Sequence, residues 1–87
     1  SVEVENALYN HPSVLEAAVV GVPDPMYGEE VKAFIVKKEG TEVSAEELKS
    51  FLSERLARYK IPKEIDFISE LPRNPGGKVL KNILINQ

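Results

Sequence analysis

Residues 14–20 read Val-Leu-Glu-Ala-Ala-Val-Val, an apolar run that is bounded by Gly21 and Pro23. A short apolar run rich in β-branched residues, with turn residues beside it, is typical of a strand buried on both faces. A second such run covers residues 31–37, after a turn predicted over residues 24–28. The two runs are close enough along the chain to pair as a hairpin.

Helical patterns flank these two strands. Upstream, residues 4–8 place apolar side chains at helical spacing, and Pro12 limits how far this helix extends. Downstream, Ser44 and Glu47 are spaced as a capping box, which predicts the start of a longer helix. The apolar stripe of that helix is Leu48, Phe51, Leu52 and Leu56.

Two further elements complete the pattern. Residues 65–67 predict a third strand, and residues 79–84 predict a short terminal helix. The order α-β-β-α-β-α predicts an α+β fold, in which helices pack on a small sheet of about three strands. The 87 residues fit one domain, whose small core leaves little room for the walled cleft of an independent enzyme.

Composition narrows the classes of function. The net charge is −3 with both signs interspersed, which argues against a nucleic-acid-binding face. Cysteine is absent and His11 is the only histidine, so no metal site is predicted. No apolar run approaches the roughly 18–20 residues that span a membrane, and no signal peptide is visible. The expected compartment is the cytoplasm.

Lys78 lies in a segment rich in proline and glycine, residues 71–81. Proline restricts the backbone and glycine frees it, which predicts a loop with a defined approach and a mobile tip. Such a tip can deliver an ammonium to carboxylate or phosphate oxygens in a site made by other residues. A solvated surface lysine is the alternative. A P-loop is excluded, since Pro72 and Val79 stand where that motif needs Gly and Ser or Thr.

This segment resembles the C-terminal signature of the adenylate-forming superfamily, which includes acyl-CoA synthetases, peptide-synthetase adenylation domains and luciferases. The shared pattern is Leu-Pro, polar residues, Gly-Lys, then an apolar and a basic residue. Four other blocks resemble the same family in the same order: residues 3–14, 16–24, 28–36 and 56–62. The resemblance therefore covers nearly the whole chain.

The resemblance implies that residues 1–87 are the mobile C-terminal domain of a longer enzyme. Its partner would be a large N-terminal domain that holds the nucleotide and acyl pockets. The chain begins Ser1-Val2-Glu3 and its only methionine is Met26, which fits a piece of a longer polypeptide. Removal of an initiator methionine before a small residue is the alternative.

The same resemblance implies that Lys78 is the catalytic lysine of adenylate formation, carried by the loop that contains Gly77. In that step a carboxylate attacks the α-phosphate of ATP, which Mg²⁺ accompanies. An ammonium between the two anions would offset their repulsion and stabilise charge on the transferring oxygens.

In the family's second step the small domain rotates, and another of its faces meets CoA. Gly21, Val22 and Pro23 lie at the predicted turn that resembles the segment beside the pantetheine channel. Tyr59 occupies a position where an aromatic ring can stack on the CoA adenine; capping the core at the end of a helix is the alternative. Lys60 would either meet a CoA phosphate or remain solvated.

Three features depart from the family pattern. The hinge residue would lie upstream of Glu3, outside the chain. Lys81 stands where arginine is usual, and Ile61 stands where some relatives place an arginine for CoA. Lysine lacks the bidentate geometry of arginine, which weakens the contacts implied at position 81. Isoleucine has no charge, which weakens the CoA contact implied at position 61.

The expected function is that of an AMP-forming fatty-acid–CoA ligase, because residues 21–24, 59–62 and 77–81 resemble acyl-CoA synthetases most. Its substrates would be a carboxylic acid, ATP and CoA, and the isolated domain would be inactive. Two alternatives stay open: an adenylation domain that loads a carrier protein, and a non-catalytic interaction module.

Overall fold

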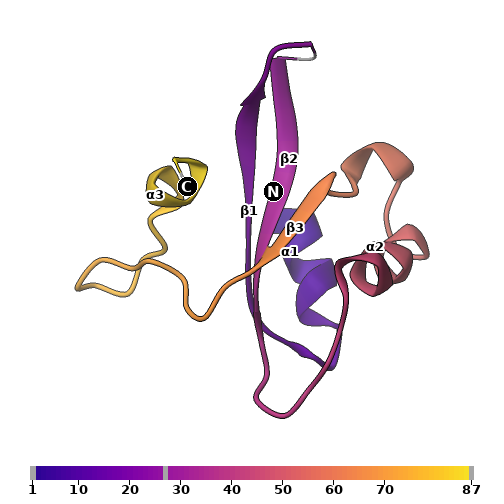
Figure 1. The fold of residues 1–87 in the computed structure, drawn as a ribbon, viewed down its shortest axis with the longest axis horizontal. Helices are drawn as coiled ribbons and strands as arrows, with labels where there is room; N and C mark the ends of the chain where they lie inside the picture. Colours follow the sequence, from indigo (N-terminus) through magenta and orange to yellow (C-terminus); the bar gives the residue numbers. More distant parts are fainter. Residues whose placement is uncertain (1, 27, 87) are drawn as a thin grey trace.

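The computed structural model describes residues 2–26 and 28–86 (Figure 1). The elements are α1 (Val2–Tyr9), β1 (Val14–Asp24), β2 (Gly28–Lys37), α2 (Ala45–Ser53), the 3₁₀ helix η1 (Arg58–Lys60), β3 (Glu64–Phe67) and α3 (Lys81–Ile85). The predicted order of helices and strands is confirmed, and η1 is an addition to it.

The sheet has the order β1-β2-β3. Strands β1 and β2 are antiparallel, with Ala17 opposite Ile35 and Ala18 opposite Phe34, as the predicted hairpin requires. Strand β3 runs parallel to β2, because α2 crosses over between them. The longest strand, β1, therefore lies at an edge of the sheet.

Strand β1 is longer than predicted, and this corrects one expectation. Gly21, Val22 and Pro23 do not lie at a turn; they pair with β2. A proline is tolerated here because β1 is an edge strand. The amide of Val19 points to the open edge, where it donates to the carboxylate of Glu5. Pro23 lies four residues after Val19, so its backbone nitrogen also points to the open edge. Proline lacks an N–H, and at this position the lack removes no hydrogen bond from the sheet.

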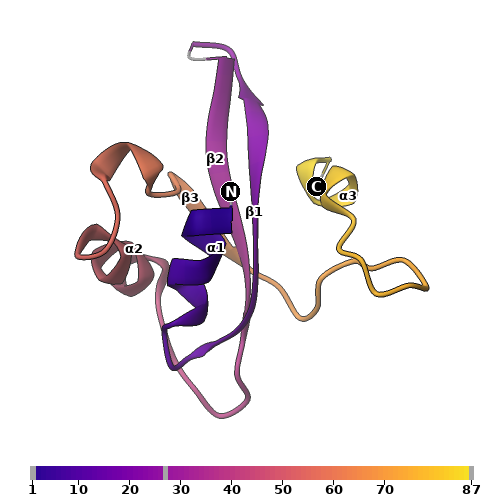
Figure 2. The same cartoon turned by 180° about the vertical axis from the view of Figure 1, so that it is seen from behind.

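The sheet has an apolar cluster on each face, as predicted. Helices α1 and α2 lie on one side of the sheet, and α3 lies on the other (Figures 1 and 2). Along β1, Ala17 and Val19 face one cluster and Ala18 and Val20 face the other, because successive strand residues point to opposite faces. Helices α1 and α2 build the first cluster with Leu8, Leu48 and Leu52. Leu71 and Leu84 of the C-terminal segment build the second. Leu15 differs from the prediction, since about half of it is exposed.

The local signal for the start of α2 is confirmed. The capping box of α2 is present: the Glu47 amide donates to Ser44 Oγ at 3.0 Å, and the Ser44 amide donates to Glu47 Oε1 at 3.4 Å. The helix ends at Ser53, so Leu56 packs against the core from beyond it.

Among the described residues, no helix combines the length and apolar composition that a membrane crossing requires.

Candidate functional site

Residues 73–79 form a small hydrogen-bonded hairpin that carries Lys78. Arg73 and Val79 form an antiparallel bridge, which delays the start of α3 to Lys81. Asn74 closes the tip: its amide donates to the Lys78 carbonyl at 3.0 Å, and its Oδ1 accepts from the Lys78 amide at 3.0 Å. Gly77 adopts a φ of +90°, which favours glycine. The predicted mobile tip is thus closed by hydrogen bonds in the structure.

Lys78 is exposed and borders a surface hollow of about 490 Å³, the lysine hollow. Its lining residues are Glu5, Tyr9, Ala17, Ala18, Arg73, Lys78, Val79 and Lys81. The hollow therefore lies between α1, the free edge of β1 and the hairpin. These elements are far apart in sequence, so the hollow is a product of the tertiary fold.

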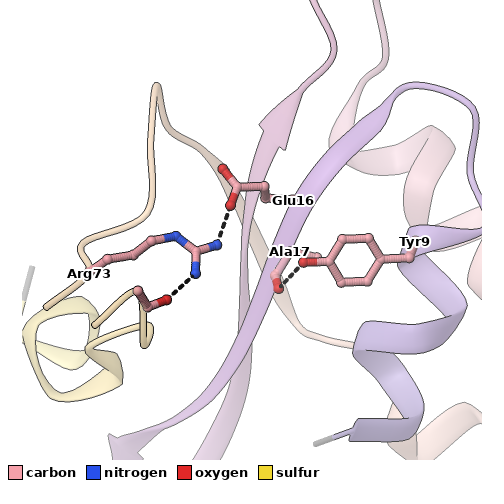
Figure 3. A network of polar contacts seen from close by, with 5 residues as sticks. Tyr9, Glu16, Ala17 and Arg73 are labelled. Carbon is pink, nitrogen blue, oxygen red and sulfur yellow. Dashed lines mark hydrogen bonds and ion pairs between the residues drawn. The ribbon is translucent and has the colours of Figure 1, made fainter. Parts of the chain in front are cut away.

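The lysine hollow has three cationic side chains, and two of them are paired with carboxylates. Lys81 Nζ lies 2.8 Å from Glu5 Oε2. Arg73 pairs with Glu16 of β1, and its second nitrogen donates to the Gly77 carbonyl at 2.6 Å (Figure 3). No carboxylate pairs with the Lys78 ammonium among the side chains that the structure describes. Lys78 is therefore the cation that this arrangement leaves available to an external anion.

Glu5 is held in its charged form. Burial acts to raise the pKa of Glu5, but hydrogen bonds from Lys81 and the Val19 amide, with the charge of Lys81, lower it below its ordinary value. The carboxylate therefore stays committed to Lys81 and to β1 at neutral pH.

Tyr59 lies in a second hollow, far from Lys78 in the fold. It belongs to η1 and is 81% exposed, so the alternative that it caps the core is wrong. This tyrosine hollow has a volume of about 290 Å³. Its lining residues are Asp24, Glu30, Val31, Arg58, Tyr59, Ile61 and Lys63. The lists of lining residues for the two hollows have no member in common.

Sequence reasoning missed Arg58 and Lys63, the cations of the tyrosine hollow. The sequence around Tyr59 is basic, which could have indicated both residues, but only Lys60 was predicted to meet CoA. Lys60 does not line the hollow; it pairs with Glu3, and this hydrogen bond raises the pKa of Lys60.

The tyrosine hollow also contains two carboxyl groups. Desolvation first, and then a hydrogen bond shared with Asp24, raise the pKa of Glu30, while the charge of Lys63 opposes the shift. Residues 21–23 line neither hollow, but they lead along β1 to Asp24, which does line this one. The hollow therefore presents an exposed aromatic ring between groups of both charges.

Comparison with known proteins identifies the family. Residues 3–78 match the AMP-binding enzyme C-terminal domain. The chain is 50% identical over 84 residues to the sulfoacetate–CoA ligase of Cupriavidus necator, covering 97% of this chain and 16% of that protein. It is 48% identical over 82 residues to the fatty acid–[acyl-carrier-protein] ligase ScoC of Streptomyces coeruleorubidus, covering 94% and 16%.

A solved structure supports the same assignment. The fatty acyl CoA synthetase of Mycobacterium tuberculosis matches with a TM-score of 0.89 and 42% identity, over 97% of this chain and 16% of that one. The fold and the sequence thus agree on one class of domain. The chain belongs to the AMP-binding enzyme C-terminal domain family. It spans about one sixth of the length of the relatives described here.

Proposed function

We propose that this chain is the C-terminal domain of an AMP-forming acyl-CoA synthetase and that Lys78 is its catalytic lysine. The observation that carries the proposal is the arrangement of charges at the lysine hollow. Arg73 and Lys81 are each paired with a carboxylate, whereas Lys78 has no such partner within the described residues. A lysine at the exposed tip of a hairpin can reach a site on another domain.

The chemistry requires one added cation. In adenylate formation a substrate carboxylate oxygen attacks the α-phosphorus of ATP, and pyrophosphate leaves. Both reactants are anionic, so the Lys78 ammonium would offset their repulsion and stabilise charge on the transferring oxygens. Mg²⁺ would neutralise phosphate oxygens of the bound ATP. No group of three or more His, Asp or Glu residues in the described part of the chain is placed to hold a metal ion. The proposal therefore assigns the nucleotide and metal sites to a large N-terminal domain.

The tyrosine hollow is our candidate for the CoA face. The exposed ring of Tyr59 suits stacking on an adenine. Arg58 and Lys63 line this hollow and Lys60 does not, so Arg58 and Lys63 are our candidates to meet a phosphate. Because the two hollows share no lining residue, one pose of the domain can serve adenylation and another can serve thioester formation. Separate hollows support a rotation of the domain between the two steps.

We propose fatty acids as the substrate class and CoA as the acceptor. The fatty acyl CoA synthetase of known structure is 42% identical to this chain, which supports both choices. A relative named for a fatty acid but for an acyl-carrier-protein acceptor is 48% identical, so loading of a carrier protein is the second candidate. Supplying the full-length enzyme with CoA or with acyl carrier protein in parallel separates the two.

The decisive experiment is Lys78→Ala in the full-length enzyme. Adenylate formation should fall about a hundredfold or more, since removing one preorganised charge contact at a transition state costs on the order of 3 kcal/mol. Thioester formation from supplied acyl-adenylate should be spared. ATP–pyrophosphate exchange measures the first step, and CoA consumption with synthetic acyl-adenylate measures the second.

Lys81→Ala is the matched control, and its effect should be milder. Acetylation of Lys78 should reproduce the alanine variant, because it removes the same charge. The assignment is wrong if Lys78→Ala keeps adenylation within a fewfold of wild type, or if both steps fall equally.

A further inference from the structure

We infer that Arg73 and Glu16 act together as positioning residues for Lys78, by bracing the hairpin against β1. The inference rests on the proposed role of Lys78 and deepens it. It concerns two residues that do not need to touch the substrate, because they act through the backbone of the loop.

A single guanidinium joins the hairpin tip to the sheet. One nitrogen of Arg73 donates to the Gly77 carbonyl at 2.6 Å, and the other donates to Glu16 Oε1 (Figure 3). Gly77 directly precedes Lys78, and Glu16 belongs to β1. The planar fork of arginine suits this double contact, since its two donors have a fixed relative geometry. The position of the Lys78 backbone is thus coupled to the sheet.

The other end of the hairpin has an anchor of its own. Lys81 pairs with Glu5 of α1, and the same oxygen of Glu5 accepts from the Val19 amide of β1 at 2.7 Å. The hairpin is therefore tied to the β1 edge both before and after Lys78. Of the three cations that line the lysine hollow, Lys78 alone has no carboxylate partner among the described residues.

Arg73 and Glu16 are partly shielded from solvent, so their ion pair can hold the hairpin more firmly than a fully solvated pair would. The side chain of Glu16 is 28% exposed and that of Arg73 is 40% exposed. A partly shielded pair that also makes a backbone hydrogen bond loses less to solvent screening than an isolated surface pair. Catalysis by a positioned cation is sensitive to displacement of about 1 Å, which can cost up to a hundredfold in rate.

The test is a double-mutant cycle in the full-length enzyme, with Arg73→Met, Glu16→Ala and the double variant. The kcat of adenylation should fall about ten- to hundredfold in each single variant, with the KM for ATP little changed. The kcat of adenylation in the double variant should be no lower than in the less active single variant, since both substitutions remove the same brace. Thioester formation from supplied acyl-adenylate should stay within about twofold of wild type, because Lys78 is not needed there.

Arg73→Lys separates geometry from charge. Lysine keeps the positive charge but lacks the fork that spans Gly77 and Glu16, so this variant should behave like Arg73→Met. Hydrogen exchange supplies a readout that is independent of activity. Amides of residues 74–80 should exchange faster in all of these variants, while those of β2 should not. Arg55→Met is the matched control, because Arg55 pairs with Glu54 and stacks on Phe51, away from the hairpin.

Three results would overturn the brace: full activity of Arg73→Lys, multiplicative losses in the double variant, or equal losses in both half-reactions. Lys78→Ala belongs in the same series. If Lys78→Ala retains adenylation, the proposed function itself fails. If Lys78→Ala is inactive while the Arg73 and Glu16 variants match wild type, only the brace is wrong.

Discussion

Lys78 and Lys81 are the same residue type three positions apart, yet they differ in their ion pairs. Lys81 follows the hairpin and pairs with Glu5, whereas Lys78 at the tip has no carboxylate partner in the described chain. The contact of Lys81 with Glu5 is a single ion pair. At the scale of single residues, pairing rather than residue type marks the candidate catalytic lysine.

Tyr59 carries the residue-scale prediction for the second step. Tyr59→Ala in the full-length enzyme should raise the CoA concentration needed for half-maximal thioester formation about ten- to hundredfold. The physical reason is that base stacking on an aromatic ring is worth roughly 1–3 kcal/mol. Adenylate formation should be nearly unchanged. Initial rates at varied CoA concentration measure the effect.

Tyr59→Phe is the matched control, because it keeps the ring face and removes only the hydroxyl. It should retain most of the CoA affinity. An unchanged CoA dependence in a folded Tyr59→Ala variant would show that Tyr59 does not stack on CoA.

At the scale of elements, helix α1 does more than cover the sheet. Its Glu5 accepts from the Val19 amide, and its Tyr9 hydroxyl donates to the Ala17 carbonyl at 3.4 Å (Figure 3). Both partners lie on the free edge of β1, whose backbone groups would otherwise be open to pairing with another chain. The helix thus caps part of an edge strand, and the same cap forms one wall of the lysine hollow.

Helix α2 begins at a complete capping box, which gives an element-scale prediction. Ser44→Ala should lower the free energy of unfolding of the domain by about 1 kcal/mol, because the Glu47 amide loses its acceptor. Urea unfolding followed by circular dichroism measures this change. Ser53→Ala is the control at the other end of the helix, where the hydroxyl donates to the Ser50 carbonyl, and it should change stability by less than about 0.5 kcal/mol. Equal stability of Ser44→Ala and wild type would show that the cap contributes nothing.

At the scale of the whole molecule, the two faces of the sheet each have an apolar cluster of their own. The described chain therefore has a buried core of its own on each face of the sheet. We expect the isolated 87 residues to fold but not to catalyse, because the proposed function places the nucleotide pocket on another domain. Cooperative thermal unfolding would show the fold, and ATP–pyrophosphate exchange with several acids would test for activity. Robust exchange by the isolated chain would contradict the proposal that the nucleotide site belongs to another domain.

Local patterns in the sequence were sufficient to predict the order of the α-helices and strands, but not η1 or the full length of β1. The apolar run at residues 14–20 predicted a strand with two buried faces, and Ser44 with Glu47 predicted the start of α2. Both signals depend on residues a few positions apart, so they are readable before the chain folds. The Gly-Lys segment likewise pointed to Lys78 and to the family, because its motif is contiguous.

Only the tertiary structure decided how these parts meet. The parallel placement of β3, the extension of β1 through Pro23 and the exposure of Tyr59 depend on which strand lies at the edge and on where η1 packs. The pairs Arg73–Glu16 and Lys81–Glu5 join residues 57 and 76 positions apart. No local pattern encodes such contacts, because each exists only after the hairpin has packed against β1 and α1. The sequence by itself therefore indicated Lys78 as the candidate lysine, and the fold determined which contacts hold its hairpin in place.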